Sequence, residues 1–236
     1  MNPGLQIGLI HELPQGPVSG LWRSSGTGKC KPVLFILAVQ FIDYGFHNFY
    51  ISTHYKPEII RNYFGDGSKF GVNITYNYEP DLLGTAGALL PFQNNLKDDP
   101  FFVIYGDNYI CFDLLDLKLF NEEMSADISI LFHWRKDISS SGVALFNSKD
   151  RITNFEEKPL DINDDGDWVN AGVYYIEACD IIDLIKTYDD FGVDIFPKLL
   201  NMDYDLYGLK TSADLIAIDT PELLVESSKR IKNKYN

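Results

Sequence analysis

The sequence predicts a layered α/β fold with a mixed, mostly parallel central sheet, and two observations support this prediction. Between residues 49 and 105, short apolar strand-like runs alternate with helical segments, a pattern typical of parallel strands joined by crossover helices. Beyond residue 113, strand-like segments follow one another with few helices between them, which indicates an antiparallel second half. No repeat or linker interrupts the pattern, so we expect residues 1–236 to form one domain.

Apolar runs bounded by glycine and proline define the individual elements. Phe101–Tyr105 is fully apolar, as expected of a central strand covered on both faces. Further strands are expected at Phe49–Thr53, Asn73–Tyr78, Asp127–Phe132, Gly142–Phe146, Ile152–Glu156 and Val169–Ile176. Helices are expected at Val33–Tyr44, Pro57–Phe64, Thr85–Leu90, Leu114–Met124, Cys179–Thr187, Asp194–Leu200 and Pro221–Lys232.

Residues 1–30 differ from the rest of the chain because glycine, proline and serine recur through them. This punctuation argues against a helix and leaves Leu5–Ile10 as the only candidate strand of the stretch. Pro32 suits the first position of the helix expected to follow.

The chain is acidic, with 20 Lys and Arg residues against 34 Asp and Glu residues, a formal charge of −14 and a pI of about 4.6. Such a surface repels nucleic acids and anionic lipids, which argues against general binding to either. A phosphorylated small ligand remains compatible with this charge, because a bound metal and a few cations reverse the potential locally.

The three cysteines, Cys30, Cys111 and Cys179, are widely spaced and odd in number. They indicate reduced thiols, without a disulfide framework or a zinc site. The longest apolar run, Val33–Val39, is too short to cross a bilayer, and the N-terminus lacks the pattern of a secretion signal. We therefore expect a soluble, cytoplasmic protein that does not bind membranes.

The segment Tyr105-Gly106-Asp107-Asn108 directly follows the apolar strand. Ligands of open α/β sheets bind beyond the carboxyl ends of the strands, and one carboxylate together with phosphate oxygens is a common way to hold Mg²⁺. Gly106 would give access to the backbone, and Asp107 would supply the carboxylate. The alternative is an ordinary Gly-Asp turn.

Small residues open the helix expected after strand 73–78, in the segment Leu83-Gly84-Thr85-Ala86-Gly87-Ala88-Leu89. They would let a planar base or a phosphate approach the backbone N–H groups. Tight packing of the helix on the sheet is the alternative.

Two later segments carry polar residues suited to a phosphorylated sugar. In Phe155–Pro159, the carboxylates suit sugar hydroxyls and Lys158 suits a phosphate, while Asn170 and Gly172 add an amide and an open backbone. A solvated charged turn is the alternative. Asp219 precedes the last helix in Ile218–Glu222, where capping of that helix is the alternative.

Together, the order and spacing of these segments resemble the sugar nucleotidyltransferases, also called nucleotide-sugar pyrophosphorylases. These enzymes join a nucleoside triphosphate to a sugar 1-phosphate and release pyrophosphate. The resemblance runs from about Lys31 to Glu222 and also includes Lys31–Leu34, Gly142-Val143 and Asp194–Pro197. It implies a three-layer, Rossmann-like nucleotidyltransferase domain.

The resemblance also implies roles for individual residues. Asp107 and Asp219 would hold Mg²⁺, and Asp107 and Lys158 would be the catalytic residues. The nucleotide would contact Gly84, Thr85, Gly87, Gly106 and Asp107. The sugar phosphate would contact Gly142, Glu157, Lys158, Asn170 and Gly172. The attacking phosphate oxygen is already anionic, so the reaction needs positioning and charge neutralisation rather than a general base. His54 is therefore expected to be a hydrogen-bonded structural residue.

One motif of the family is missing. Relatives begin with a glycine-rich loop ending in Gly-Thr-Arg, followed by Pro-Lys-Pro, which binds the triphosphate. Here the corresponding stretch is Gly8–Pro14, and Trp22-Arg23-Ser24 stands where Pro-Lys-Pro is expected. Either a reading-frame error or a real loss of the loop explains this, and Lys29 within Ser25–Lys29 is a candidate substitute cation.

Two functions remain open at this point. The first is sugar-1-phosphate nucleotidyl transfer, with GTP favoured because the chain length is similar to that of the heptose- and mannose-1-phosphate guanylyltransferases. A glucose or cytidylyl branch is an alternative within this reading. The second function is a catalytically impaired relative that binds a nucleotide sugar and regulates a partner.

Overall fold

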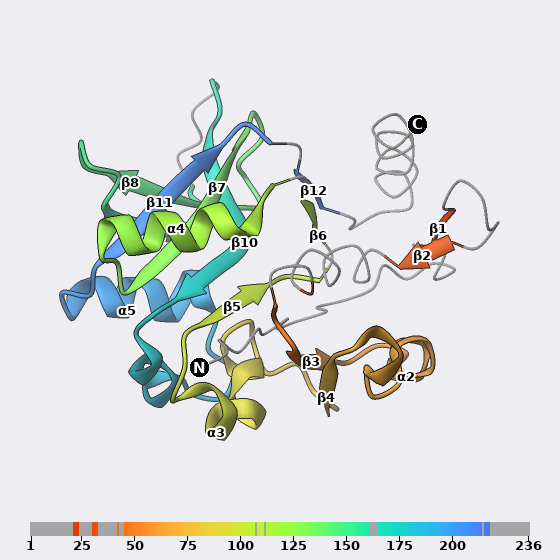
Figure 1. Cartoon of the computed structure of the whole chain (residues 1–236). Helices are drawn as coiled ribbons and strands as arrows, with labels where there is room; N and C mark the ends of the chain where they lie inside the picture. Colours follow the sequence, from red (N-terminus) through yellow and green to blue (C-terminus); the bar gives the residue numbers. More distant parts are fainter. Residues whose placement is uncertain are drawn as a thin grey trace.

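The computed structural model describes residues 21–23, 30–32, 42, 45–106, 108–110, 112–160, 165–213 and 215–217. These residues form an α/β fold around a mixed six-stranded sheet (Figure 1). The predicted α/β class, with a Rossmann-like arrangement around a mixed sheet, is confirmed.

The main sheet has the strand order β11-β7-β10-β8-β9, and β5 pairs with β10 beside this path. β11 runs parallel to β7, whereas β10 runs antiparallel to β5, β7 and β8, and β8 runs antiparallel to β9. The strands are β5 (Phe101–Ile104), β7 (Ile128–Arg135), β8 (Gly142–Phe146), β9 (Ile152–Glu157), β10 (Asp167–Ile176) and β11 (Leu206–Thr211).

Three strand pairs lie outside this sheet. β3 (Asn48–Thr53) and β4 (Asn73–Tyr78) are parallel. β6 (Asn108–Ile110) and β12 (Leu215–Ala217) are antiparallel, as are β1 (Leu21–Arg23) and β2 (Cys30–Pro32).

The helices include α2 (Pro57–Phe64), α3 (Gln93–Leu96), α4 (Leu114–Met124) and α5 (Phe196–Asn201). Short 3₁₀ turns form η1 (Ser68–Phe70), η2 (Gly87–Phe92) and η3 (Cys179–Leu184), and one π turn forms η4 (Phe191–Ile195).

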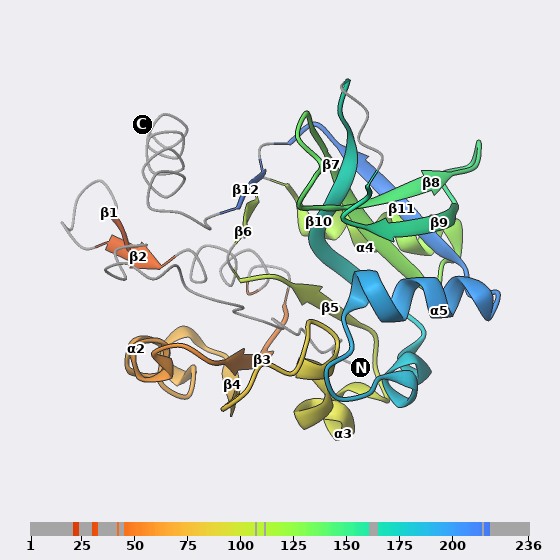
Figure 2. The same cartoon turned by 180° about the vertical axis from the view of Figure 1, so that it is seen from behind.

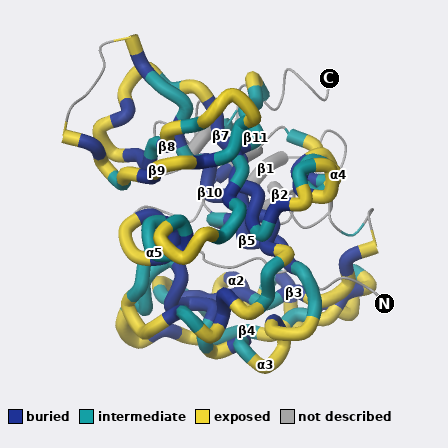
Figure 3. The backbone as a smooth tube through the Cα atoms, turned by 90° about the vertical axis from the view of Figure 1, so that its left-hand side faces the viewer, coloured by how far each residue is buried: buried dark blue, intermediate teal, exposed yellow. Residues whose placement is uncertain are grey.

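Both faces of the main sheet are buried, which creates the expected three layers. Phe102 and Ile104 of β5 share an apolar cluster with Leu117 of α4, whereas Phe101 and Val103 share a second cluster with residues of α5, η3 and η4. Because alternate side chains of a strand point to opposite faces, the two clusters lie on opposite sides of β5. Figures 1 and 2 show α4 and α5 on these opposite faces, and Figure 3 shows the buried parts of β5 and β10 between them.

Several elements differ from the sequence prediction. Residues 87–92 and 179–184 form 3₁₀ turns where α-helices were expected, and Pro91 lies inside η2, where it disfavours regular α-helix. Pro32 belongs to strand β2 rather than to a helix start. Strands β1, β6, β11 and β12 had no predicted counterpart.

The expected strand at Leu5–Ile10 and the expected helix at Pro221–Lys232 lie outside the described residues, as does nearly all of the expected helix at Val33–Tyr44. Within the described ranges, no helix combines the length and the apolar character needed to span a bilayer.

Candidate active site

The site begins at an irregularity in β10. The register of β10 against β7 shifts between Asn170 and Tyr174, and Gly172 adopts a positive φ of 66°. The Asn170 side-chain oxygen accepts a hydrogen bond from the Gly172 N–H at 2.9 Å, and the Gly172 carbonyl accepts one from the Tyr105 N–H at 2.9 Å. A Cβ at Gly172 would lie 2.7 Å from the Tyr105 ring, so this position requires glycine.

The Glu157 carboxylate lies against two glycines from different elements. Gly142 pairs with Glu157 across β8 and β9. A Cβ at Gly142 would come within 2.5 Å of Glu157 Oε2. A Cβ at Gly192 would collide with the same oxygen. Burial raises the pKa of Glu157, and the nearby negative charge of Asp190 raises it further, whereas Lys158 lowers it.

Lys158 follows directly on β9 and is exposed. Its backbone has a positive φ of 51°, and its N–H donates to the Ser141 carbonyl at 3.1 Å. Its ammonium group is therefore available to a ligand next to the Glu157 carboxylate.

A loop at residues 83–87 packs against a second loop at residues 186–190, which we call the connecting loop. The Asp189 carbonyl accepts hydrogen bonds from the N–H groups of Ala86 and Gly87, and the Tyr188 N–H donates to the Leu83 carbonyl. A Cβ at Gly84 would collide with the Asp189 carbonyl. These glycines therefore pack against the connecting loop, whereas the alternative considered above was packing of a helix on the sheet.

Thr85 and Asp190 join these two loops through their side chains. The Thr85 hydroxyl donates to Asp190 Oδ2 at 2.6 Å and accepts from the Phe191 N–H at 2.8 Å. The other Asp190 oxygen caps η4 by accepting from the N–H groups of Gly192 and Val193 at 2.8 and 3.2 Å. Asp190 therefore fixes Thr85 on one side and the Gly192 backbone beside Glu157 on the other.

Two tyrosines connect this arrangement to β10. The fully buried Tyr174 hydroxyl accepts from Asn170 Nδ2 at 2.8 Å and donates to the Tyr105 hydroxyl at 3.1 Å. Burial raises the pKa of Tyr105 and Tyr174, and a hydrogen bond with Thr85 partly opposes the shift at Tyr105. Both hydroxyls consequently stay protonated at neutral pH and act as donors.

The expected metal ligands, Asp107 and Asp219, lie outside the described residues, and so do Ile218 and Thr220 beside Asp219, whereas Gly106 and Asn108 on either side of Asp107 are described. Gly106 is buried just beyond the end of β5. In the antiparallel β6–β12 pair, Asn108 lies opposite Ala217.

The structure thus brings Thr85, Gly142, Glu157, Asn170 and Gly172 into one neighbourhood, linked through Asp190 and the tyrosine pair. Gly84 and Gly87 border it through the connecting loop. We call this neighbourhood the cluster. Within the described ranges, no group of three or more His, Cys, Asp or Glu side chains is placed to hold a metal ion.

Sequence reasoning missed Asp190, Tyr105 and Tyr174. Asp190 could have been found from the sequence, because an Asp shortly before the Asp194–Pro197 motif is a typical cap of the helix that this motif begins. In the structure its N–H donates to Asp194 Oδ2 at 2.8 Å. Tyr174 lies in the apolar half of β10, and Tyr105 directly follows the apolar strand β5. Nothing in their local sequence separates a hydrogen-bonded hydroxyl from ordinary core packing.

A buried carboxylate also supports the 83–87 loop. Glu79 is 2% exposed and accepts hydrogen bonds from the Ser52 hydroxyl and, at 2.9 Å, from the Leu83 N–H. His54 Nδ1 bonds the Glu79 carbonyl oxygen at 2.7 Å, so the expected hydrogen bond of this histidine is present.

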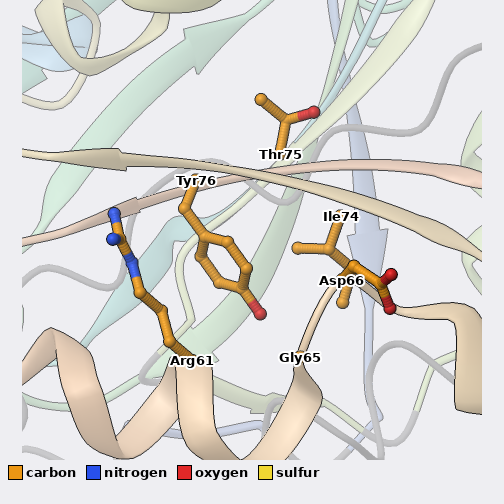
Figure 4. A pocket seen from close by; sticks show the side chains of 6 residues that line it. All are labelled: Arg61, Gly65, Asp66, Ile74, Thr75 and Tyr76. Atoms are coloured by element: carbon orange, nitrogen blue, oxygen red, sulfur yellow. The ribbon is translucent and has the colours of Figure 1, made fainter.

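One pocket lies away from the cluster, between α2 and β4 (Figure 4). Its volume is about 500 Å³, and its lining residues are Arg61, Gly65, Asp66, Ile74, Thr75 and Tyr76. The Tyr76 hydroxyl is buried, and no hydrogen-bond partner for it occurs among the described residues. None of the predicted site residues lines this pocket.

The fold is of the α/β class whose ligands bind beyond the carboxyl ends of the strands, and here glycine-rich loops and polar side chains lie near the strand ends. The chain belongs to the nucleotidyl transferase family, whose model matches residues 26–214.

Curated relatives agree with this assignment. The chain is 30% identical over 203 residues to a UTP–glucose-1-phosphate uridylyltransferase of Synechocystis sp., a match covering 80% of this chain and 52% of the relative. It is 31% identical over 209 residues to a mannose-1-phosphate guanylyltransferase of Mycobacterium tuberculosis, a match covering 84% of this chain and 57% of the relative. The match therefore spans little more than half the length of either relative.

Solved structures confirm the fold. HddC from Yersinia pseudotuberculosis, crystallised with GMP-PN, superposes with a TM-score of 0.71 at 20% identity, covering 97% of this chain and 99% of that one. A putative glucose-1-phosphate thymidylyltransferase from Bacillus anthracis superposes with a TM-score of 0.76 at 20% identity, covering 97% of this chain and 94% of that one.

Proposed function

We propose that this chain transfers a nucleotidyl group from a nucleoside triphosphate to a sugar 1-phosphate, giving a nucleotide sugar and pyrophosphate. The observation that carries the proposal is the cluster, which joins the expected nucleotide loop to the expected sugar-phosphate residues in a nucleotidyl transferase fold. The names of the relatives favour this activity over a purely regulatory role.

The sugar phosphate would bind along β8, β9 and the β10 irregularity. The Glu157 carboxylate is suited to accept hydrogen bonds from sugar hydroxyls, and the exposed Lys158 supplies a positive charge for the phosphate. Asn170 offers its remaining amide hydrogen, and Gly142 and Gly172 would border the ligand at positions where they let the side chains of Glu157 and Tyr105 approach the backbone closely.

The nucleotide would meet the 83–87 loop through its backbone. The Thr85 hydroxyl is fully used by hydrogen bonds with Asp190, Phe191 and Tyr105, so it positions the loop rather than touching the base. In the described part of the chain, the N–H groups of Gly84 and Thr85 donate to no acceptor. Two adjacent N–H groups without partners suit the acceptor atoms of a base. Gly87 packs on the connecting loop, and Gly106 leads to the metal ligands.

Asp107 and Asp219 would hold a Mg²⁺ ion at the end of the β6–β12 ladder. The preference of Mg²⁺ for carboxylate and phosphate oxygens supports this role, and the described residues Asn108 and Ala217 pair across the ladder. When bound, the ion would supply charge neutralisation on the phosphates.

The reaction would be an in-line displacement at the α-phosphorus. An anionic oxygen of the sugar phosphate forms the new P–O bond, and the bond to the β-phosphate oxygen breaks as pyrophosphate leaves with its electron pair. No proton has to move, so the protein's task is to align the two reactants and to offset their charge. Lys158 would provide such a charge on the sugar-phosphate side.

The N-terminal stretch that lacks the Gly-Thr-Arg loop lies before residue 26, where the family match begins. Loss of the cations of that loop would lower turnover, since single electrostatic contacts in active sites contribute roughly 3 kcal/mol each. We therefore propose slow turnover for the chain as written.

GTP and a mannose-like sugar 1-phosphate are our first choice of substrates, because several relatives are named mannose-1-phosphate guanylyltransferases. A uridylyltransferase among the relatives keeps UTP and glucose 1-phosphate as the second choice. We also propose a cytoplasmic location, as expected from the cysteine usage.

A pyrophosphate-release assay tests the proposal. It combines GTP, UTP, dTTP, CTP and ATP with mannose, glucose and heptose 1-phosphates in the presence of MgCl₂. We expect release with one or two pairs and its loss in Asp107→Asn, with the far-UV circular dichroism unchanged. Absence of release with every pair would contradict the proposed activity, and full activity of Asp107→Asn would remove Asp107 from the site.

A further inference from the structure

The two tyrosines of the cluster carry hydroxyl groups that the core does not need for packing. The Tyr174 ring packs on the rings of Tyr105, Phe191 and Phe196, with centroids 5.8, 5.0 and 5.1 Å away. A phenylalanine ring would make the same contacts without burying a polar group. The hydroxyl must therefore be accounted for by its hydrogen bonds.

One of these bonds fixes the side chain of Asn170. Its Oδ1 accepts from the Gly172 N–H at 2.9 Å, and one hydrogen of Nδ2 goes to the Tyr174 hydroxyl at 2.8 Å. With both ends of the amide engaged, the group cannot flip, and one N–H and one lone pair remain in a fixed direction. Without the Tyr174 hydroxyl, only the oxygen end would be held.

Tyr105 holds the other end of this connection. Its hydroxyl accepts the hydrogen of Tyr174 at 3.1 Å, its N–H bonds the Gly172 carbonyl at 2.9 Å, and its ring fills the space that a Cβ at Gly172 would need. Tyr105 also immediately precedes Gly106 and Asp107. One residue thus links the β10 irregularity to the segment expected to carry the metal.

We propose that the hydroxyl groups of Tyr174 and Tyr105 position the Asn170 amide for the sugar 1-phosphate. The inference rests on the proposed function, and it assigns the tyrosines a positioning role rather than contact with the reacting atoms. Tyr174 acts directly on Asn170, and Tyr105 acts through Tyr174. Loss of the first hydroxyl should therefore weaken sugar-phosphate binding more than loss of the second.

The test compares Tyr174→Phe and Tyr105→Phe with wild type in steady-state kinetics. We expect the KM for the sugar 1-phosphate to rise by about two- to tenfold in Tyr174→Phe, in line with one net hydrogen bond, and less in Tyr105→Phe. The KM for the nucleoside triphosphate and kcat should change by less than about twofold in Tyr174→Phe. Tyr76→Phe, which removes a buried hydroxyl outside the cluster, is the matched control and should leave all constants unchanged.

A double-mutant cycle separates positioning from general destabilisation. In an Asn170→Ala background, Tyr174→Phe should have no further effect on the sugar 1-phosphate KM, because the amide it positions is gone. An undiminished effect in that background, or equal increases in both KM values in the single variant, would overturn the inference.

Failure of the proposed function is distinguishable from failure of this inference. If the wild-type protein releases no pyrophosphate, the proposed function is contradicted. In that case the affinities of wild type and Tyr174→Phe for GDP-mannose and UDP-glucose, measured by calorimetry, take the place of the KM values. Equal affinity of wild type and Tyr174→Phe overturns the positioning role. Absence of any binding by the wild type overturns both.

Discussion

Buried tyrosine hydroxyls are treated in opposite ways in two regions of this molecule. Between β5 and β10, the hydroxyls of Tyr105 and Tyr174 bond each other and reach Asn170. Between α2 and β4, the hydroxyl of Tyr76 is buried and finds no partner in the part of the chain that the structure describes. Since an unpaired buried hydroxyl costs stability whereas a paired one can hold a neighbour in place, the β5–β10 region is the one built for positioning side chains. The four variants below test that difference.

The largest loss of stability is expected at Gly172, which lies against the Tyr105 ring. Gly172→Ala would force a side chain into a backbone with φ of 66° and against the Tyr105 ring at 2.7 Å. We expect a loss of about 3 kcal/mol in the free energy of unfolding, measured by urea denaturation. Gly71→Ala is the control, since φ is 75° there but nothing lies within 4 Å of the new Cβ. Equal losses in the two variants would show that the Tyr105 contact is unimportant.

Asp190→Ala should come second, because its carboxylate accepts from Thr85, Gly192 and Val193. Loss of a helix cap and of a charge-assisted bond predicts about 2–3 kcal/mol of destabilisation. Asp137→Ala is a matched control, because that carboxylate accepts two bonds from Ser139 in an exposed turn, and it should cost much less stability than Asp190→Ala. A wild-type melting temperature for Asp190→Ala would contradict the role given to Asp190.

A pH dependence is expected from Glu157, whose pKa is raised by burial first and by Asp190 second. A carboxyl group with a raised pKa binds its proton more tightly in the folded state, so its stabilising contribution is complete below the ordinary pKa and is lost as the pH rises through the folded value. The stability of wild type relative to Glu157→Gln should therefore fall as the pH rises above about 4.5. A constant difference between the two proteins from pH 4 to pH 7 would rule out the shift.

The smallest effect, and the only stabilising one, is expected from Tyr76→Phe. Removing a buried hydroxyl without a partner should raise the free energy of unfolding by up to about 1 kcal/mol, whereas Tyr174→Phe should lower it. Thermal denaturation of the two variants in parallel compares the regions directly. A loss of stability in Tyr76→Phe would mean that its hydroxyl does have a partner.

Elements with a clear local pattern were predicted well from the sequence. The bounds of α2, α4, β4 and β8 agree with the expected ones, because glycines or caps border clear apolar patterns. The segments at 85–90 and 179–187 were harder. Pro91 disfavours regular α-helix in the first segment. The 83–87 loop also contacts the connecting loop closely, and this tertiary contact favours short 3₁₀ turns in both segments.

Residue type alone singled out Glu157, Asn170 and Gly172 in the sequence, and the structure brings them together in the cluster, while their contacts with a ligand stay predictions. The site was not predictable where the role depends on a distant partner. Thr85 looks like a nucleotide contact in the sequence, yet its hydroxyl is bonded to Asp190, 105 residues away. The strands β6 and β12 are only three residues long, so their pairing has too little periodicity to detect in the sequence.

Hydrogen exchange read by mass spectrometry, with and without GDP-mannose or UDP-glucose, tests most directly whether the cluster is the binding site. A nucleotide sugar carries both ligand halves, so it should protect the backbone amides of residues 83–88, 156–158 and 170–174 together and leave those of residues 61–76 unchanged. Protection confined to residues 61–76 would move the site to the pocket between α2 and β4 and contradict the account.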